Sequence, residues 1–245
     1  MNGNDPIELM FGGLQKLGPG SDAETRRALS LLPAREWGLV VDAGCGSGRQ
    51  TLVLAQEIDS IVHAVDNYQP FLDDLNRRAG ALGIAGQIET HCFSMETIPE
   101  HFRQIDLLWS EGAAYSIGFG NALRCWASAI VSGGYLAVSE LSWLEQPMNE
   151  REREFFAREY PDMRSVEENV ALAEAAGYRL VESFVMPRET WWEGYYELLE
   201  PRARRLVAHA DPEIRLFAEQ TVEEVEVFKQ SKGSYGYLFL LLQRR

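Results

Sequence analysis

The segment whose residue types most clearly suggest chemistry is a glycine-rich turn that follows an acidic residue. It reads Val-Asp-Ala-Gly-Cys-Gly-Ser-Gly over residues 41–48, between an apolar run and an amphipathic stretch over 51–58. Glycine lets a backbone turn sharply from a strand into a helix, and it lets a ligand approach that backbone closely. We therefore expect residues 41–48 to bind a ligand.

The spacing of these glycines excludes two common phosphate-binding motifs. The dinucleotide fingerprint G-x-G-x-x-G needs a third glycine where this chain has Arg49. A P-loop ends in Gly-Lys-Ser or Gly-Lys-Thr, and residues 41–48 contain no lysine. The pattern that remains is an acidic residue followed by G-x-G-x-G.

A second acidic residue, Asp66, follows the next apolar run along the chain. It lies between Val65 and Asn67, where a strand is predicted to end. A carboxylate at this place can accept hydrogen bonds from both hydroxyls of a ribose. The alternative is an aspartate that caps the following helix. The glycine turn at the expected distance upstream favours the ribose contact.

Glu111, Tyr115 and Glu140 are the residues best suited to act on a substrate. Both glutamates follow apolar runs, and ligands of a doubly wound sheet bind outside the carboxyl ends of its strands. Carboxylates there can bind a cationic amine, or remove a proton from a hydroxyl or an acidic carbon. The competing interpretations are a cap for Glu111, an arginine partner for Glu140 and ordinary packing for Tyr115.

The pattern of apolar runs predicts the sheet that positions these residues. Strands are expected over 39–41, 61–65, 87–92, 105–109, 135–138, 180–185 and 237–242. Helices are expected among the first five of them, over 51–58, 70–82 and 121–131. Buried strands that alternate with helices are typical of a doubly wound α/β fold. We therefore predict a mostly parallel sheet of seven strands with helical insertions at the C-terminal rim of the strands.

Three further helices show their first residues in the sequence. Ser-x-x-Glu capping boxes at 21–24 and 165–168 predict two of them, which end before Pro33 and at Gly177. The third is predicted to begin at 211–213, where proline follows a capping aspartate. Its apolar face is expected to consist of Ile214, Phe217, Thr221, Val222, Val225 and Phe228.

With these motifs and elements, the sequence resembles the class I S-adenosylmethionine-dependent methyltransferases. The resemblance covers about residues 36–187 and the last strand. It looks closest to the small-molecule branch, the ubiquinone/menaquinone-biosynthesis-like or type 11 methyltransferases. It implies a Rossmann-like methyltransferase fold, S-adenosyl-L-methionine as the cofactor and transfer of its methyl group to a small-molecule acceptor.

The resemblance also assigns roles to individual residues. The acidic residue and the glycines would hold the methionine moiety, Asp66 the ribose, and the residues after the third strand the adenine. The expected cofactor-binding residues are Asp42, Gly44, Cys45, Gly46, Gly48, Gln50, Asp66, Asn67, Ser94, Met95 and Glu111. The expected catalytic residues are Glu111, Tyr115 and Glu140, and Glu111 is assigned to both sets because it can also order the cofactor's amine.

The chain is expected to form one methyltransferase domain over residues 1–245, in four parts. They are an N-terminal arm and helix (1–35), a cofactor-binding core (36–187), a helical lid insertion (189–232) and a last strand (235–245). Long insertions at the rim of an α/β sheet commonly build pockets or lids. The charged segment 146–162 is also expected to be helical.

Two segments outside the core have a predicted role in closing the site. In the lid insertion, Trp191, Tyr195 and Leu198 are expected on one helical face, and Trp192, Tyr196 and Leu199 on the adjacent one. These aromatic residues can be interpreted in two ways: as a wall of the substrate pocket, or as residues that only pack the insertion against the sheet. Glycines on both sides of the apolar residues in 11–20 suit an arm that folds over the cofactor, and a frayed terminus is the alternative.

Several differences between this sequence and particular methyltransferase classes narrow the kind of methyltransferase that it resembles. The Asp/Asn-Pro-Pro-aromatic signature of enzymes that methylate nucleic bases is absent, because residues 109–115 read Trp-Ser-Glu-Gly-Ala-Ala-Tyr. Arsenite methyltransferases need several positioned thiols, and one of the three cysteines lies inside the glycine turn. The magnesium site of the catechol type would lack a third ligand. A non-catalytic cofactor-binding module or sensor stays the main alternative function, and an NAD-dependent oxidoreductase the weaker one.

Charge and composition bear on partners and location. The chain of 245 residues has 23 Lys and Arg against 37 Asp and Glu, for a net charge of −14. So acidic a protein is a poor ligand for nucleic acid, and a neutral or cationic acceptor is expected. The cysteines form no CxxC pair, the first residues lack a secretory pattern, and no apolar run is long enough for a membrane span. We therefore expect a soluble cytoplasmic protein and leave open whether it is a homodimer.

No metal is expected from the sequence. The four histidines are scattered along the chain and match no zinc-binding spacing.

Overall fold

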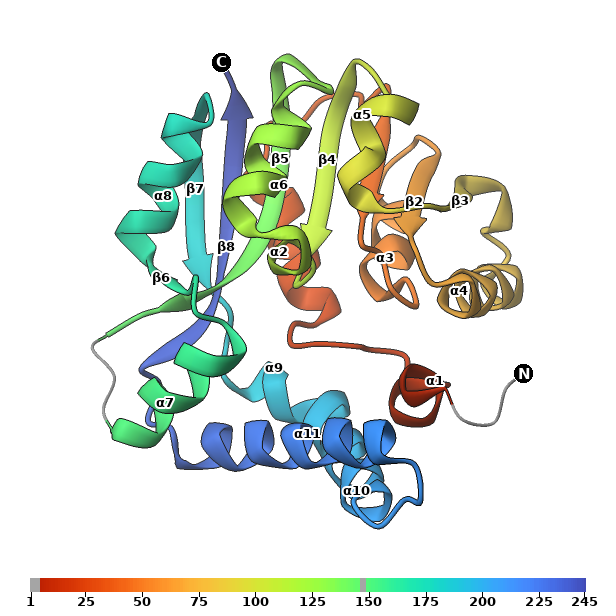
Figure 1. The fold of residues 1–245 in the computed structure, drawn as a ribbon. Coiled ribbons are helices and arrows are strands. Elements are labelled where there is room, and N and C mark those ends of the chain that lie inside the picture. The colour runs from red at the N-terminus through yellow and green to blue at the C-terminus, as the bar shows by residue number, and fades with distance from the viewer. Residues whose placement is uncertain (1–4, 146–148) are drawn as a thin grey trace.

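The computed structural model describes residues 5–145 and 149–245, and a mostly parallel sheet lies at its centre (Figure 1). The order of the neighbouring strands is β3-β2-β1-β4-β5-β8-β7. These strands are β1 (Val40–Ala43), β2 (Val62–Asp66), β3 (Ile88–Cys92), β4 (Ile105–Glu111), β5 (Ile130–Trp143), β7 (Tyr178–Val185) and β8 (Tyr235–Arg244). The prediction of a doubly wound, mostly parallel sheet of seven strands is confirmed.

Pairing within the sheet explains why the predicted ligand-binding residues lie at one edge. β1 lies between β2 and β4, and it is parallel to both. The ends of these three strands, with their acidic residues, therefore meet at the same side. Only β8 is antiparallel to its neighbours, β5 and β7. The two-residue strand β6 (Arg164–Ser165), which the sequence did not predict, pairs with the far end of β5.

Two layers of helices cover the sheet, because apolar side chains of the buried strands alternate between its faces. One layer contributes Ala28, Leu54 and Leu75 to its core, and the other contributes Ile98 and Trp126. The first layer consists of α2 (Asp22–Leu31), α3 (Arg49–Glu57) and α4 (Gln69–Leu82). The second consists of α5 (Ile98–His101), α6 (Phe119–Ala127) and α8 (Val166–Ala175), which Figure 1 shows in front of the sheet.

A third group of helices lies beyond the carboxyl ends of the parallel strands (Figure 1). It consists of α1 (Pro6–Phe11), α7 (Glu150–Glu159), α9 (Glu189–Trp191), α10 (Glu197–Leu206) and α11 (Pro212–Gln230). The helix predicted in 146–162 corresponds to α7, and residues 146–148 lie outside the described residues. Among the residues described, no helix has both the length and the apolar character needed to cross a membrane.

The helix starts agree with the predicted caps, with one difference in detail. The capping box at α8 is complete, and Asp211 caps α11. At α2 the hydroxyl of Ser21 accepts a hydrogen bond from the backbone N–H of Ala23, while Glu24 contacts that hydroxyl instead of a backbone N–H. The start of α2 is therefore capped by one serine and not by a reciprocal box.

Two predictions about helices are wrong. The helix expected over 121–131 ends at Ala127, because β5 already begins at Ile130. Ile130 pairs with Ile105 of β4, and the register of this strand pair shifts between Ile105 and Leu107. The aromatic segment is not one helix with two faces. The backbone of Glu193 is extended and Gly194 has φ +69°, so α9 and α10 are separated by a break.

Candidate functional site

The glycine turn has the backbone geometry that its sequence requires. Gly44, Gly46 and Gly48 have φ values of +68°, +56° and +79°, a region that residues with a Cβ atom rarely occupy. A Cβ atom at Gly46 would lie 2.8 Å from Leu17, and one at Gly48 would lie 2.3 Å from Leu75. The turn therefore needs glycine for its own conformation and for close packing against the N-terminal arm and α4.

Asp42 lies beneath the turn and not at its surface. It is fully buried, and its carboxylate accepts hydrogen bonds from the Thr51 hydroxyl at 2.6 Å and the Gln50 amide at 3.4 Å. Burial raises the pKa of Asp42 to about 7, against the smaller opposing effect of the Thr51 hydrogen bond. This carboxylate joins the end of β1 to α3, so the direct ligand contact expected of Asp42 does not fit its position.

Asp66 orients the same turn from the end of β2. One carboxylate oxygen accepts the backbone N–H of Gly46 at 2.9 Å, and the other accepts that of Tyr68 at 2.9 Å. Burial raises the pKa of Asp66, and these backbone hydrogen bonds oppose the rise. Each oxygen keeps a second lone pair, so Asp66 can position the turn and still accept a ligand's hydroxyl.

A cavity of about 520 Å³, here called the loop cavity, opens at the glycine turn. Most of the predicted cofactor-binding residues line it. They are Gly44, Cys45, Gly46, Gln50, Asp66, Asn67, Ser94, Met95 and Glu111. Asp42 and Gly48 are not in contact with it, because the first lies under the turn and the second faces α4.

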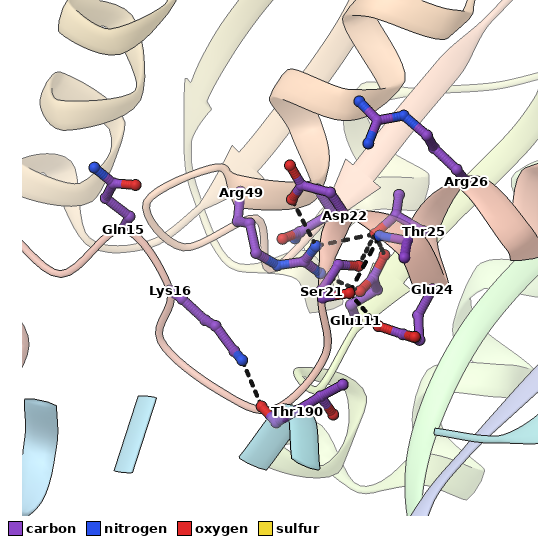
Figure 2. Close-up of polar contacts among 12 residues, drawn as sticks. Gln15, Lys16, Ser21, Asp22, Glu24, Thr25, Arg26, Arg49, Glu111 and Thr190 are labelled. Carbon is purple, nitrogen blue, oxygen red and sulfur yellow. Dashed lines mark hydrogen bonds and ion pairs between the residues drawn. The ribbon is translucent and has the colours of Figure 1, made fainter. Parts of the chain in front are cut away.

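Glu111, expected to be a catalytic residue, is fully engaged by other side chains. Its Oε1 accepts the Thr25 hydroxyl at 2.7 Å and the Trp109 indole N–H at 2.8 Å. Its Oε2 lies 2.5 Å from a guanidinium nitrogen of Arg49. Figure 2 shows Arg49 directed at Glu111 and Thr25, and a second nitrogen of Arg49 lies 3.3 Å from Asp22. A carboxylate held in this way positions an arginine at the loop cavity and is poorly suited to remove a proton.

Lys16 adds a second cation to the wall of the loop cavity. Its ammonium group donates a hydrogen bond to the backbone carbonyl of Thr190 (Figure 2). It donates another, at 2.8 Å, to the backbone carbonyl of Glu193. Burial, followed by the nearby charge of Arg49, lowers the pKa of Lys16 to about 8. Lys16 thereby links the N-terminal arm to the segment between α9 and α10.

A second cavity, of about 380 Å³, lies under the rim helices and is here called the aromatic cavity. More than half of its lining residues are aromatic, and its charged lining residues are Glu159 and Glu224. The hydroxyl of Tyr196 donates to Glu224 at 2.5 Å, and burial raises the pKa of that glutamate. This cavity suits an apolar or planar body with a neutral or positive charge.

The two cavities share a wall. The shared lining consists of Phe11, Leu17, Gly18, Pro19, Gly112, Tyr115 and Phe217. The arm is fixed there, because the carbonyl of Leu14 accepts the Ser47 hydroxyl at 3.2 Å and that of Gly12 accepts Arg202 at 2.7 Å. Residues 11–19 therefore form an ordered part of the site and not a frayed end. Tyr115 lies at the junction, where the sequence placed a substrate-orienting residue.

Glu140 lines neither cavity, but it reaches the aromatic cavity through Tyr160. The Tyr160 hydroxyl donates to Oε1 of Glu140, and Oε2 is buried without a hydrogen-bond partner. Burial raises the pKa of Glu140 to about 8, and the Tyr160 hydrogen bond opposes this rise in part. Tyr160 itself lines the cavity, and its ring lies 6.0 Å from that of Tyr115. The arginine partner considered for Glu140 contributes only through the charge of Arg164.

Three residues of the site were not expected from the sequence. In the sequence Arg49 only departs from the dinucleotide motif, but an arginine in the first turn after a glycine loop can reach a strand-end acid. Lys16 and Tyr160 gave no local signal, because each becomes part of the site through contacts with distant segments.

The comparisons with known proteins agree with this arrangement. Residues 40–134, from β1 to the start of β5, match the family model of a methyltransferase domain. This part of the chain is therefore similar to a methyltransferase domain. The family resemblance inferred from the glycine turn is thus confirmed for the domain and its fold.

One curated relative of this methyltransferase domain is the dimethylglycine N-methyltransferase of Parasynechococcus marenigrum (strain WH8102). The two chains are 32% identical over 106 residues, which is 42% of this chain and 38% of that protein. The matched region therefore spans well under half of the relative's length.

Solved structures extend the similarity of fold to the whole chain. A methyltransferase from Thiobacillus denitrificans, in complex with S-adenosyl-L-homocysteine, has a TM-score of 0.80 and 21% identity, with all of both chains covered. One from Geobacter sulfurreducens, in complex with the same compound, has a TM-score of 0.79 and 19% identity, with 98% of each chain covered. The arm and the rim helices are therefore part of a shared architecture.

Proposed function

We propose that this protein transfers a methyl group from S-adenosylmethionine to a small-molecule acceptor. The observation on which the proposal rests is that a methyltransferase domain has two adjoining cavities with a shared wall. The loop cavity would hold the cofactor and the aromatic cavity the acceptor. Both volumes lie in the range of small-molecule sites.

The donors and acceptors around the loop cavity fit this cofactor. Asp66 would accept hydrogen bonds from the ribose, and the backbone of the glycine turn would lie along the methionine moiety. Arg49 and Lys16 are two cations on the same cavity wall, and they would bind the cofactor's carboxylate. When bound, S-adenosylmethionine supplies an electrophilic methyl group on a sulfonium.

The chain's own contribution to rate is alignment and exclusion of water. Tyr115 and Gly112 at the junction would set the position of the accepting atom relative to the loop cavity. Holding two reactants at near-attack distance supplies much of the rate of a bimolecular reaction. Segments 11–19 and 189–232 supply most of the shared wall and part of the aromatic lining, so we propose that they act together as the cover of the site.

The acceptor is proposed to be neutral or cationic. No lysine, arginine or histidine lines the aromatic cavity in the part of the chain that the structure describes. Two arginines of α10 are engaged elsewhere: Arg202 binds backbone carbonyls of the arm, and Arg204 binds Glu200 and Glu226. An aromatic lining also stabilises a cation. An acceptor with an amine is consistent with the relative that methylates nitrogen. If such an acceptor also carried a free carboxylate, that carboxylate would have to reach toward Lys16.

Glu140 and Tyr160 are proposed to remove the proton that the acceptor loses on methylation. The acceptor's hydroxyl or amine would give a proton to the Tyr160 oxygen while Tyr160 gives its own to Glu140. The unpaired Oε2 and the raised pKa of Glu140 suit a group that takes up a proton near neutral pH.

The test has a binding part and a turnover part. Calorimetry should show binding of S-adenosylhomocysteine and no binding of NAD. Incubation with S-adenosylmethionine and matched panels of neutral, cationic and anionic metabolites should give +CH₂ products, by mass spectrometry, from the first two panels only. Binding without any product would favour the non-catalytic module, and products mainly from the anionic panel would contradict the proposed acceptor.

A matched pair of variants tests the charge of the acceptor. Glu224→Gln removes one of the two carboxylates that line the aromatic cavity, while Glu226→Gln changes a residue of the same helix that binds Arg204 instead. The first should raise KM for cationic acceptors about tenfold or more and leave neutral ones nearly unchanged, whereas the second should affect neither. An equal effect of both variants would exclude Glu224 as a substrate contact.

A further inference from the structure

Two histidines that are far apart in the sequence meet on one face of the sheet, at its β3 edge. His63 is on β2, and Glu89 and His91 are on β3, with His63 and Glu89 paired in the parallel register. The imidazole atoms His63 Nδ1 and His91 Nε2 are 3.1 Å apart. Oε2 of Glu89 lies 3.7 Å from His63 Nδ1, and Oε1 of Glu89 lies 3.7 Å from His91 Nε2. One ligand atom from each of the three side chains lies within 4.8 Å of the other two.

The separations of these atoms match the geometry of a metal centre. Around a tetrahedral ion with bonds of about 2.0–2.1 Å, ligand atoms lie roughly 3.3–3.4 Å apart. The two imidazole nitrogens are 3.1 Å apart, and each lies 3.7 Å from its nearer Glu89 oxygen, so the observed separations lie on either side of this value. No backbone rearrangement is needed to bring the ligands together, because the strand register already holds them on one face.

The surroundings of this cluster resemble those of a site open on one side. Phe102 packs against both imidazoles, with ring centroids 5.2 Å from each. The side chains of His63 and His91 are about four-fifths buried, whereas that of Glu89 is 59% exposed. An ion would thus be shielded by aromatic rings below and would keep a position open to water above Glu89.

We propose that His63, Glu89 and His91 bind one divalent transition-metal ion of the zinc class. Two imidazole nitrogens and one carboxylate are ligands that such ions favour, whereas calcium and magnesium prefer oxygen alone. Neither cavity of the catalytic site includes any of the three residues, so this site is separate from the proposed methyl transfer. The ion would join β3, which among the described residues pairs with β2 alone, to the strand that ends in Asp66.

The alternative to a metal site is a hydrogen bond between the two imidazoles. Zn²⁺ binding to protein that carries no affinity tag and has been treated with a chelator distinguishes these alternatives. Calorimetry with Zn²⁺ alone should show one site per chain with a dissociation constant below about 10 µM. Co²⁺ in its place should give the visible absorption of a tetrahedral or five-coordinate ion. Absence of both signals in the native chain would overturn the proposal without any variant.

Variants then test the ligands. His63→Asn, His91→Asn and Glu89→Gln should each weaken Zn²⁺ binding by at least tenfold, and the double histidine variant should abolish it. His101→Asn and His209→Asn are the controls: His101 stacks on Phe93 nearby, and His209 is at the start of α11. Binding of S-adenosylhomocysteine should persist in every ligand variant, which shows that they fold. Unchanged Zn²⁺ affinity in the double variant, or an equal loss in the controls, would contradict the assignment.

Discussion

At the scale of single residues, Glu140 is the group whose ionisation should be most visible in kinetics. Its pKa is raised to about 8 by burial, and its unprotonated form is the one that accepts a proton. The rate kcat should therefore rise with pH up to about 8 and then level. Glu140→Gln should lower kcat by about 10²–10⁴-fold and remove this rise. The measurement is a pH–rate profile of both proteins.

The control for Glu140 is Glu159→Gln, because Glu159 lines the aromatic cavity and its carboxylate accepts a hydrogen bond from Arg158. That variant should keep the pH-dependent rise. A Glu140→Gln enzyme with the same rise as the native one would assign the titration to another group.

Asp66 holds the glycine turn, and we propose that it also binds the cofactor directly. Asp66→Ala should weaken binding of S-adenosylhomocysteine by about 1.5–3 kcal/mol, the range for hydrogen bonds to a charged group. Calorimetry of this variant, beside Asp59→Ala at the exposed loop after α3, measures the difference. If the two variants bind equally well, Asp66 has only a local structural role.

At the scale of elements, the contact between the glycine turn and the arm can be tested at Gly46. A valine there would overlap Leu17 and would have to adopt φ +56°. Gly46→Val should therefore abolish cofactor binding and destabilise the fold by about 1–3 kcal/mol. The reason is displacement of the arm and backbone strain, in addition to any overlap with the ligand.

Gly13→Ala is the matched control for Gly46, because Gly13 has φ +69° and open space at its Cβ position. It should lower stability slightly in a denaturant titration and leave cofactor affinity unchanged. Loss of affinity in both variants would mean that the arm, and not the turn, determines binding.

The break between α9 and α10 decides which aromatic residues face the acceptor. Trp191 lines the aromatic cavity only and stacks on Phe228, with ring centroids 5.4 Å apart. Trp191→Phe should raise KM for the acceptor several-fold and leave binding of S-adenosylhomocysteine within about twofold. Trp192→Phe is the control, since Trp192 lines neither cavity. A parallel loss of cofactor affinity in Trp191→Phe would contradict the division into two cavities.

At the scale of the whole molecule, the buried Asp42 should make stability depend on pH. Its pKa is raised from 3.8 to about 7, so the folded state keeps a proton that the unfolded chain releases. The contribution of this proton to the free energy of unfolding is complete below pH 3.8 and is lost as the pH rises to about 7. Between these two pH values the free energy of unfolding should fall by up to about 1.4 kcal/mol per pH unit.

Denaturant titrations of the native protein and of Asp42→Asn at pH 5, 6 and 7 measure this slope. The asparagine variant keeps a carbonyl that accepts the Thr51 hydroxyl, and it should lose most of the contribution of Asp42. Glu140→Gln is the useful comparison, because it removes a different buried carboxylate and should keep that contribution. Identical slopes in native protein and Asp42→Asn would show that Asp42 is ionised in the fold.

The sequence by itself determined the features that depend on neighbouring residues. The apolar runs, the G-x-G-x-G turn and the helix caps predicted the sheet and its order of elements, and most of the predicted cofactor-binding residues line the loop cavity, because periodicity and glycine conformations are local properties. The tertiary structure alone decided which distant groups meet. Strand register joined His63 to His91, and packing turned Asp42 inward and bound Glu111 to Arg49. Such pairs depend on long-range burial and register, which spacing along the chain does not encode.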